Sequence, residues 1–119
     1  MQYLLLIYGN EKHFDKMSQT EQDNILQEYM EFSGSIAHSG HLRGGNELNR
    51  ISTAKTVRVR NGKRSVTDGP FAETKEQLGG YYLVEAKDYE KALALAARIP
   101  SARWGSIEVR PIIPHEMPS

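Results

Sequence analysis

The apolar segment from Tyr3 to Tyr8 places the strongest limit on how this chain folds. Successive side chains of a β-strand point to opposite faces of the sheet, and both alternating sets are apolar here. One set consists of Tyr3, Leu5 and Ile7, and the other of Leu4, Leu6 and Tyr8. Such a strand needs cover on both faces. If helices cover one face, a second copy of the chain is the expected cover for the other.

Length and composition narrow the class of protein. The 119 residues predict a single domain over residues 1–119. Fifteen basic and fifteen acidic side chains cancel, so no charge pattern indicates nucleic acid or a membrane surface as a partner. The absence of cysteine excludes disulfides and thiol chemistry. The apolar opening is too short for a membrane span and lacks signal-peptide features, which predicts a cytoplasmic protein.

Two helices are predicted. After a polar loop at 9–17, Ser18 and Glu21 have capping-box spacing, which predicts a helix from near Thr20 to Gly40. Its apolar stripe consists of Ile25, Tyr29, Phe32 and Ile36. Asp88 can cap the second helix, which has an alanine-rich face and ends before Pro100.

The strands complete a predicted α+β fold. Asn61-Gly62 joins strands at 56–60 and 63–67 into a hairpin, and further strands are expected at 79–86 and 107–113. Residues 42–48 form a short or irregular strand, and Pro114 with Pro118 predicts a frayed end. This order predicts one ferredoxin-like antiparallel sheet with both helices on one face.

The tetrapeptide Asp68-Gly69-Pro70-Phe71 has two interpretations. Its residues favour a turn, which Phe71 can anchor. Alternatively, the turn delivers the Asp68 carboxylate to a cleft, where it acts as a general base or orients a histidine.

The charged residues that follow also have two interpretations. Thr74 to Gln77 has capping-box spacing and predicts a short helical turn ending at Gly79-Gly80. Glu73 and Lys75 then belong either to a solvated face or to a charged rim that binds a polar or anionic ligand.

Alternation places further charges on strand faces. Arg58 lies opposite the valines of its strand, while Glu108 and Arg110 lie opposite Ile107 and Val109. If the apolar sides meet the helices, these charges face the second subunit. They then either bind a carboxylate or phosphate, or form a cross-strand ladder that sets register and partner choice.

The histidines give no metal site. His38 and His41 have ligand spacing, but Gly40 ends the helix between them and no carboxylate supports them. No glycine-rich phosphate loop or nucleophile-elbow serine occurs, which argues against nucleotide hydrolysis and serine hydrolase activity. No cofactor is predicted.

The sequence resembles the YCII-related proteins, also called DGPF-domain proteins. The resemblance is carried in order by Tyr3 to Tyr8, Thr56 to Arg60, Thr67 to Ala86, residues 96–100 and residues 105–111. It implies a dimeric α+β barrel, while the family's activity is mostly unassigned. The resemblance to some family members also implies a site with a histidine paired with an aspartate. No histidine here falls clearly on that pattern, and His41 reaches Asp68 only if the helix end and the loop converge.

Together these features predict a homodimer that binds a small polar or acidic molecule. Asp68 is the predicted catalytic carboxylate, with His41 as its partner, and acid–base or hydrolytic chemistry is left open. The predicted ligand-binding residues are Arg58, Glu73, Lys75, Glu108 and Arg110. The alternative is a non-catalytic regulatory or interaction module, since relatives resemble domains found near extracytoplasmic sigma factors.

Overall fold

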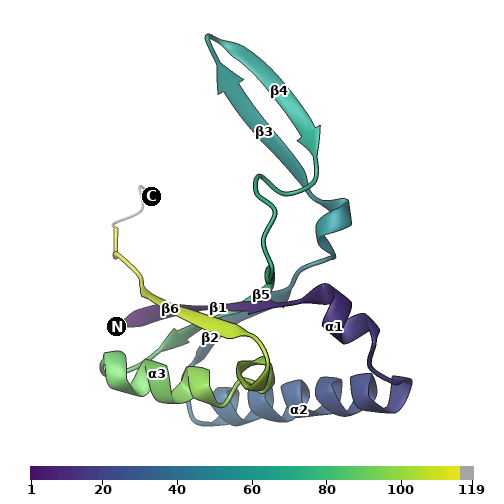
Figure 1. Cartoon of the computed structure of the whole chain (residues 1–119). Coiled ribbons are helices and arrows are strands. Elements are labelled where there is room, and N and C mark those ends of the chain that lie inside the picture. Colours follow the sequence, from purple (N-terminus) through teal and green to yellow (C-terminus); the bar gives the residue numbers. More distant parts are fainter. Residues whose placement is uncertain (116–119) are drawn as a thin grey trace.

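The computed structural model describes residues 1–115 and has an α+β fold with antiparallel sheets (Figure 1). Pro118 lies outside the described residues. The main sheet has four strands, which in spatial order are β2 (Leu42–Glu47), β5 (Gln77–Glu85), β1 (Gln2–Gly9) and β6 (Ser106–Pro111). Every neighbouring pair is antiparallel. The apolar strand β1 therefore lies inside the sheet, between β5 and β6.

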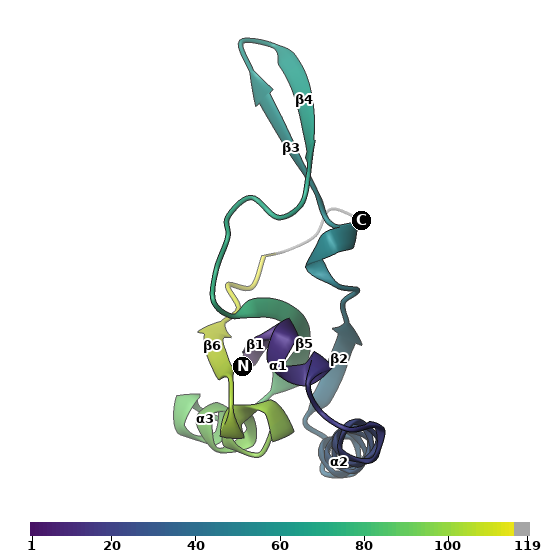
Figure 2. The ribbon, with the colours of Figure 1, turned by 45° about the vertical axis from the view of Figure 1, so that its right-hand side comes forward.

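Two long helices cover one face of the main sheet (Figures 1 and 2). Helix α2 spans Gln19–His38 and α3 spans Tyr89–Ala97, as the capping residues predict. Ser18 Oγ accepts a hydrogen bond from the Glu21 N–H at 3.1 Å, and Asp88 Oδ1 accepts one from the Lys91 N–H at 2.8 Å. Gly40, with φ of 82°, follows the end of α2 in the left-handed conformation.

The expected polar loop at 9–17 instead contains a short helix, α1 (Glu11–Asp15). Asn10 caps it, because its Oδ1 accepts a hydrogen bond from the Lys12 N–H at 2.9 Å. A helix of five residues is too short to show an apolar period, so the sequence pattern missed it. No helix within residues 1–115 is long and apolar enough to cross a membrane.

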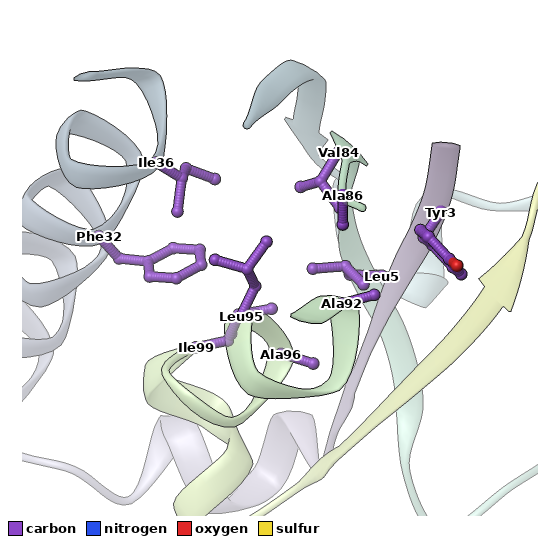
Figure 3. Close-up of a cluster of buried hydrophobic side chains, with 10 residues drawn as sticks. All are labelled: Tyr3, Leu5, Phe32, Ile36, Val84, Ala86, Ala92, Leu95, Ala96 and Ile99. Carbon is purple, nitrogen blue, oxygen red and sulfur yellow. The ribbon is translucent and has the colours of Figure 1, made fainter. Parts of the chain in front are cut away.

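The core lies between the two long helices and the sheet (Figure 3). Its buried side chains are Tyr3, Leu5, Phe32, Ile36, Val84, Ala86, Ala92, Leu95, Ala96 and Ile99. The small alanines of α3 allow that helix to pack closely on the sheet, where it lies beside β6. Phe32 and Ile36 both come from the second half of α2. Burial of apolar area at roughly 25 cal/mol per Å² makes this cluster the main source of stability.

The hairpin forms as Asn61-Gly62 predicts, but it is not part of the main sheet. Strands β3 (Lys55–Arg60) and β4 (Lys63–Asp68) form a separate two-stranded sheet, which corrects the expectation of one sheet. This arm extends away from the main sheet (Figures 1 and 2). Its valines do not reach the core, since Val57 and Val59 are 58% and 60% exposed.

The segment between the arm and β5 contains no helical turn, which corrects the expectation for Thr74 to Gln77. Thr74 Oγ1 donates to the Glu76 carbonyl at 2.5 Å, and the Gln77 side chain donates to the Thr74 carbonyl at 2.7 Å. These side chains satisfy backbone acceptors in an extended loop. Strand β5 therefore begins earlier than predicted, at Gln77.

No helix of residues 1–115 covers the other side of the main sheet, which we call the open face (Figure 1). Alternation places Leu4, Leu6 and Tyr8 on it, opposite the helix-facing Tyr3, Leu5 and Ile7. Leu4 lies opposite Arg110, and Leu6 lies opposite Glu108. Within a single chain, the apolar set on this face stays only partly buried.

Candidate functional site

A cavity of about 680 Å³ lies between α1, the first half of α2 and the edge of the main sheet formed by β2 and β5. The apolar stripe of α2 divides there. Ile25 and Tyr29 line the cavity, together with the shorter Ser33, whereas Phe32 and Ile36 belong to the core. The same stripe thus stabilises the fold at one end and encloses space at the other.

On the sheet side of the cavity, two glycines stand where a larger side chain would clash. A Cβ atom on Gly80 would lie 2.9 Å from the Asn46 carbonyl oxygen. One on Gly45 would lie 3.0 Å from a ring carbon of Tyr82. Both positions line the cavity, so the backbone itself forms part of its wall.

Four hydroxyl groups of the cavity wall form two hydrogen-bonded pairs. The hydroxyls of Tyr29 and Ser101 are 2.5 Å apart, and those of Tyr82 and Ser33 are 2.6 Å apart. Burial raises the pKa of Tyr29, and the nearby charge of Glu47 raises it further, against the lowering effect of the bond to Ser101. Tyr29 is therefore a neutral phenol at physiological pH, and these groups can hydrogen-bond a ligand.

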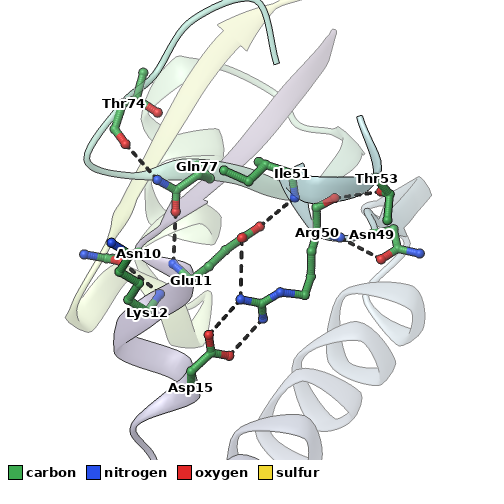
Figure 4. Close-up of polar contacts among 10 residues, drawn as sticks. All are labelled: Asn10, Glu11, Lys12, Asp15, Asn49, Arg50, Ile51, Thr53, Thr74 and Gln77. Carbon is green, nitrogen blue, oxygen red and sulfur yellow. Dashed lines mark hydrogen bonds and ion pairs between the residues drawn. The ribbon is translucent and has the colours of Figure 1, made fainter. Parts of the chain in front are cut away.

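A polar network closes one end of the cavity and joins α1 to the base of the arm (Figure 4). The Arg50 guanidinium donates to both carboxylate oxygens of Asp15, at 2.9 and 2.7 Å, and lies 3.6 Å from Glu11. The Glu11 carboxylate also accepts a bond from the Ile51 N–H at 3.0 Å. The hydrogen bond to Asp15 raises the pKa of Arg50. The charge of this lining cation is thus already neutralised.

The predicted catalytic residues belong to different sheets, Asp68 to the arm and His41 to the end of the main sheet where β2 begins. Asp68 ends β4 at the base of the arm, where it pairs with Lys55 at 2.6 Å, and its side chain is 85% exposed. His41 precedes β2 at the far end and its Nδ1 lies 2.6 Å from the Ser39 hydroxyl. Within one chain the pair of His41 and Asp68 does not form.

His41 lines a second, smaller cavity of about 300 Å³ beside the N-terminus. The terminal ammonium of Met1 lies 2.6 Å from the Glu85 carboxylate, and this hydrogen bond lowers the pKa of Glu85. The pair fixes the start of β1 against the end of β5. These contacts therefore have a structural role, which is to hold the ends of β1 and β5 together.

The predicted ligand-binding residues occupy three separate places. Arg58 lies on the arm, and Glu73 and Lys75 are exposed in the loop that follows it. Glu108 and Arg110 lie on β6, where the two side chains pair and the contact raises the pKa of Arg110. None of these five residues lines the cavity beside α2. Within residues 1–115 no group of three histidine or acidic side chains could hold a metal ion.

Two features of the sequence signal the cavity, although its presence was not predicted from them. Gln22 and Ser33 interrupt the apolar stripe of α2 on the side where a continuous core would need larger apolar residues. The double glycines at 44–45 and 79–80 were a second signal, because paired glycines mark close backbone approach.

Comparison with known proteins places the chain in a family. The model of the YCII-related domain matches residues 1–116. An uncharacterised protein of Rhizobium meliloti (strain 1021) is 35% identical over 124 aligned positions, which cover the whole of both chains. The segments that suggested this resemblance span most of the main sheet and the arm. The chain belongs to the YCII-related family.

Proposed function

We propose that the protein binds a small molecule in the cavity between α2 and the main sheet. The observation that carries the proposal is the cavity itself, whose volume of about 680 Å³ is within the range of roughly 300–1,000 Å³ typical of ligand sites. Its walls combine apolar side chains with a few convergent hydroxyl groups, an arrangement that holds an apolar body and orients its polar groups.

The test is thermal unfolding with a panel of small molecules, measured on the wild type and on Ile25→Trp. The indole should fill the cavity and abolish stabilisation by any ligand that binds there. Met30→Trp is the matched control, because Met30 lies on the same helix, is 63% exposed and does not line the cavity. Equal stabilisation of all three proteins by a ligand would contradict the proposed site.

We also propose that the main sheet has the ferredoxin-like layout and that two copies pair through their open faces as a dimeric α+β barrel. The strand order β2-β5-β1-β6, with both long helices on one face, supports the layout. The partly buried Leu4, Leu6 and Tyr8 support the pairing, since their apolar area gains cover in a dimer.

The roles of Asp68, Glu73 and Lys75 depend on this dimer. The arm and its following loop extend on the side of the open face, so in a face-to-face pair they would approach the second copy (Figure 2). A polar or acidic ligand could then be held between them and the Glu108–Arg110 pair. Asp68→Asn tests the acid–base role. If Asp68 is catalytic, this variant should lose the turnover of the wild type while the dimer stays intact.

A second candidate function is a non-catalytic interaction module. The observation that favours it is the arm, whose Val57, Val59 and Val66 are exposed and offer an apolar strip on two paired strands. If the arm binds another protein, Val59→Lys should abolish that binding while leaving small-molecule binding in the cavity unchanged.

A further inference from the structure

We infer that the cavity beside α2 selects an organic cation with an apolar body, such as an aromatic amine, and that Glu47 is its counter-ion. This inference rests on the proposed function and adds the ligand class. It follows from the charges and the rings that line the cavity.

Among residues 1–115, three of those that line the cavity have charged side chains: Glu11, Glu47 and Arg50. Arg50 is bound to Asp15 and lies beside Glu11, so its charge is matched within the wall. Glu47 has no hydrogen-bond or ion-pair partner in the part of the chain that the structure describes. Within residues 1–115, the lining and its ion pairs thus contain three carboxylates, Glu11, Asp15 and Glu47, and one cation, Arg50. Glu47 is the carboxylate without a partner, and it is exposed to solvent.

The position of Glu47 directs this charge towards the hydroxyl groups of the cavity. Glu47 ends β2 and lies opposite Gly80, where no side chain intervenes. Its charge acts on Tyr29 across the cavity. An ammonium placed between these residues would form a charge-assisted hydrogen bond with Glu47 and remain close to the phenol oxygen.

The aromatic content of the lining favours a cation as well. Among the described residues, four aromatic side chains line the cavity: Phe14, Tyr29, Tyr82 and Trp104. Tyr81 borders the cavity too, but alternation places its side chain on the open face beside Leu6. The face of an aromatic ring attracts a cation, and a ring also packs well against an apolar body. Trp104 already has the Arg103 guanidinium 5.0 Å from its ring centroid, so the other rings are left to contact the ligand.

An acidic ligand of the same shape would bind this cavity less favourably. It would approach the unmatched Glu47 carboxylate, and Arg50, the cation that lines the cavity in the described part of the chain, is already bound to Asp15. Like charges at short range disfavour each other, so the Glu47 carboxylate repels an acidic ligand. The cavity thus discriminates by charge among ligands of equal size.

The test uses three probes with the same ring and similar length: 2-phenylethylammonium, neutral 2-phenylethanol and phenylacetate. Their affinities for the wild type, Glu47→Gln and Ile25→Trp are measured by calorimetry at neutral pH. Glu90→Gln is the matched control, because Glu90 is an exposed carboxylate on α3 outside the cavity. Circular dichroism confirms that each variant is folded.

We expect the ammonium to bind the wild type most tightly, and Glu47→Gln to weaken it about tenfold, the loss typical of a charged hydrogen bond. Glu90→Gln should have no effect, and Ile25→Trp should abolish binding. Equal or tighter binding of phenylethanol or phenylacetate, still lost in Ile25→Trp, would overturn the cation inference and keep the cavity. No binding of the ammonium, or binding unaffected by Ile25→Trp, would overturn the inference. If probes bind but none is sensitive to Ile25→Trp, the proposed function fails with it.

Discussion

At the scale of single residues, Tyr29 joins the wall of the cavity to the segment that follows α3. Its hydroxyl lies 2.5 Å from that of Ser101, 72 positions along the chain. Removing the hydroxyl with Tyr29→Phe should lower the free energy of unfolding by about 1 kcal/mol, because a part-buried hydrogen bond is lost. Urea denaturation at pH 7 measures this change. A variant as stable as the wild type would show that the bond contributes nothing.

The same residue gives a prediction for alkaline pH. Burial raises the pKa of Tyr29 in the folded state above the ordinary value near 10. The unfolded state therefore loses its proton first, and the stability due to the neutral phenol is present below pH 10 and lost as the pH rises above it. The wild type should lose more stability than Tyr29→Phe between pH 9 and about 11. Parallel curves for the two proteins would contradict the raised pKa.

Asp68 shows what residue patterns can and cannot predict. Its place at the end of a hairpin strand was predictable from Asn61-Gly62 and the turn that follows. Its partner, Lys55, follows only from the register of the hairpin. His41 was a plausible partner in sequence but lies at the end of the main sheet where β2 begins, and sequence alone does not order strands in space.

Replacing Asp68 with asparagine should change the free energy of unfolding by less than about 1 kcal/mol. The ion pair with Lys55 is exposed, and exposed pairs contribute little because solvent screens them. Urea denaturation measures the change, with Lys55→Met as a second variant that removes the same pair. A loss of several kcal/mol in either variant would mean that the pair is buried in a contact with another chain.

At the scale of elements, α2 has two functions along its length. Ile36 is fully buried, while Ile25, on the same stripe, borders the cavity. Ile36→Ala should therefore cost about 2–5 kcal/mol, as is typical of a core truncation. Ile25→Ala should cost clearly less, since fewer contacts are lost. Equal losses in urea denaturation would show that the cavity is packed as a core.

The helices were predictable because their ends have strong capping residues, Ser18 and Asp88. The division of α2 was not, because a period of 3.6 residues identifies the inward face but not what lies opposite it. Helix α1 was missed for a related reason, since five residues carry a cap but no period.

At the scale of the whole molecule, the open face and the arm leave apolar side chains uncovered in one chain. Phe71 is 79% exposed beside the arm, and Leu4 and Leu6 are partly exposed on the open face. Both alternating sets of side chains in β1 are apolar, and this pattern predicted that the second face of the sheet also needs to be covered. The separation of the arm from the main sheet was not predictable, because a hairpin signal sets local pairing and not placement.

The dimer is tested by Leu4→Lys, which places a second cation opposite Arg110 on the open face. Sedimentation at micromolar concentration should show a dimer for the wild type and a monomer for this variant. Leu93→Lys is the control, since Leu93 is 41% exposed on α3, away from the open face, and this variant should stay dimeric. A monomeric wild type would contradict the pairing.

The central claim is that the cavity beside α2 is where a small molecule binds, and amide NMR tests it most directly. A ligand found by thermal unfolding is titrated into the labelled protein, and its chemical-shift changes are mapped. We predict that the largest changes fall on Ile25 to Ser33 of α2 and on Gly45 and Gly80 across the cavity. Changes confined to the loop of Glu73 and Lys75, or to β6, would contradict the account.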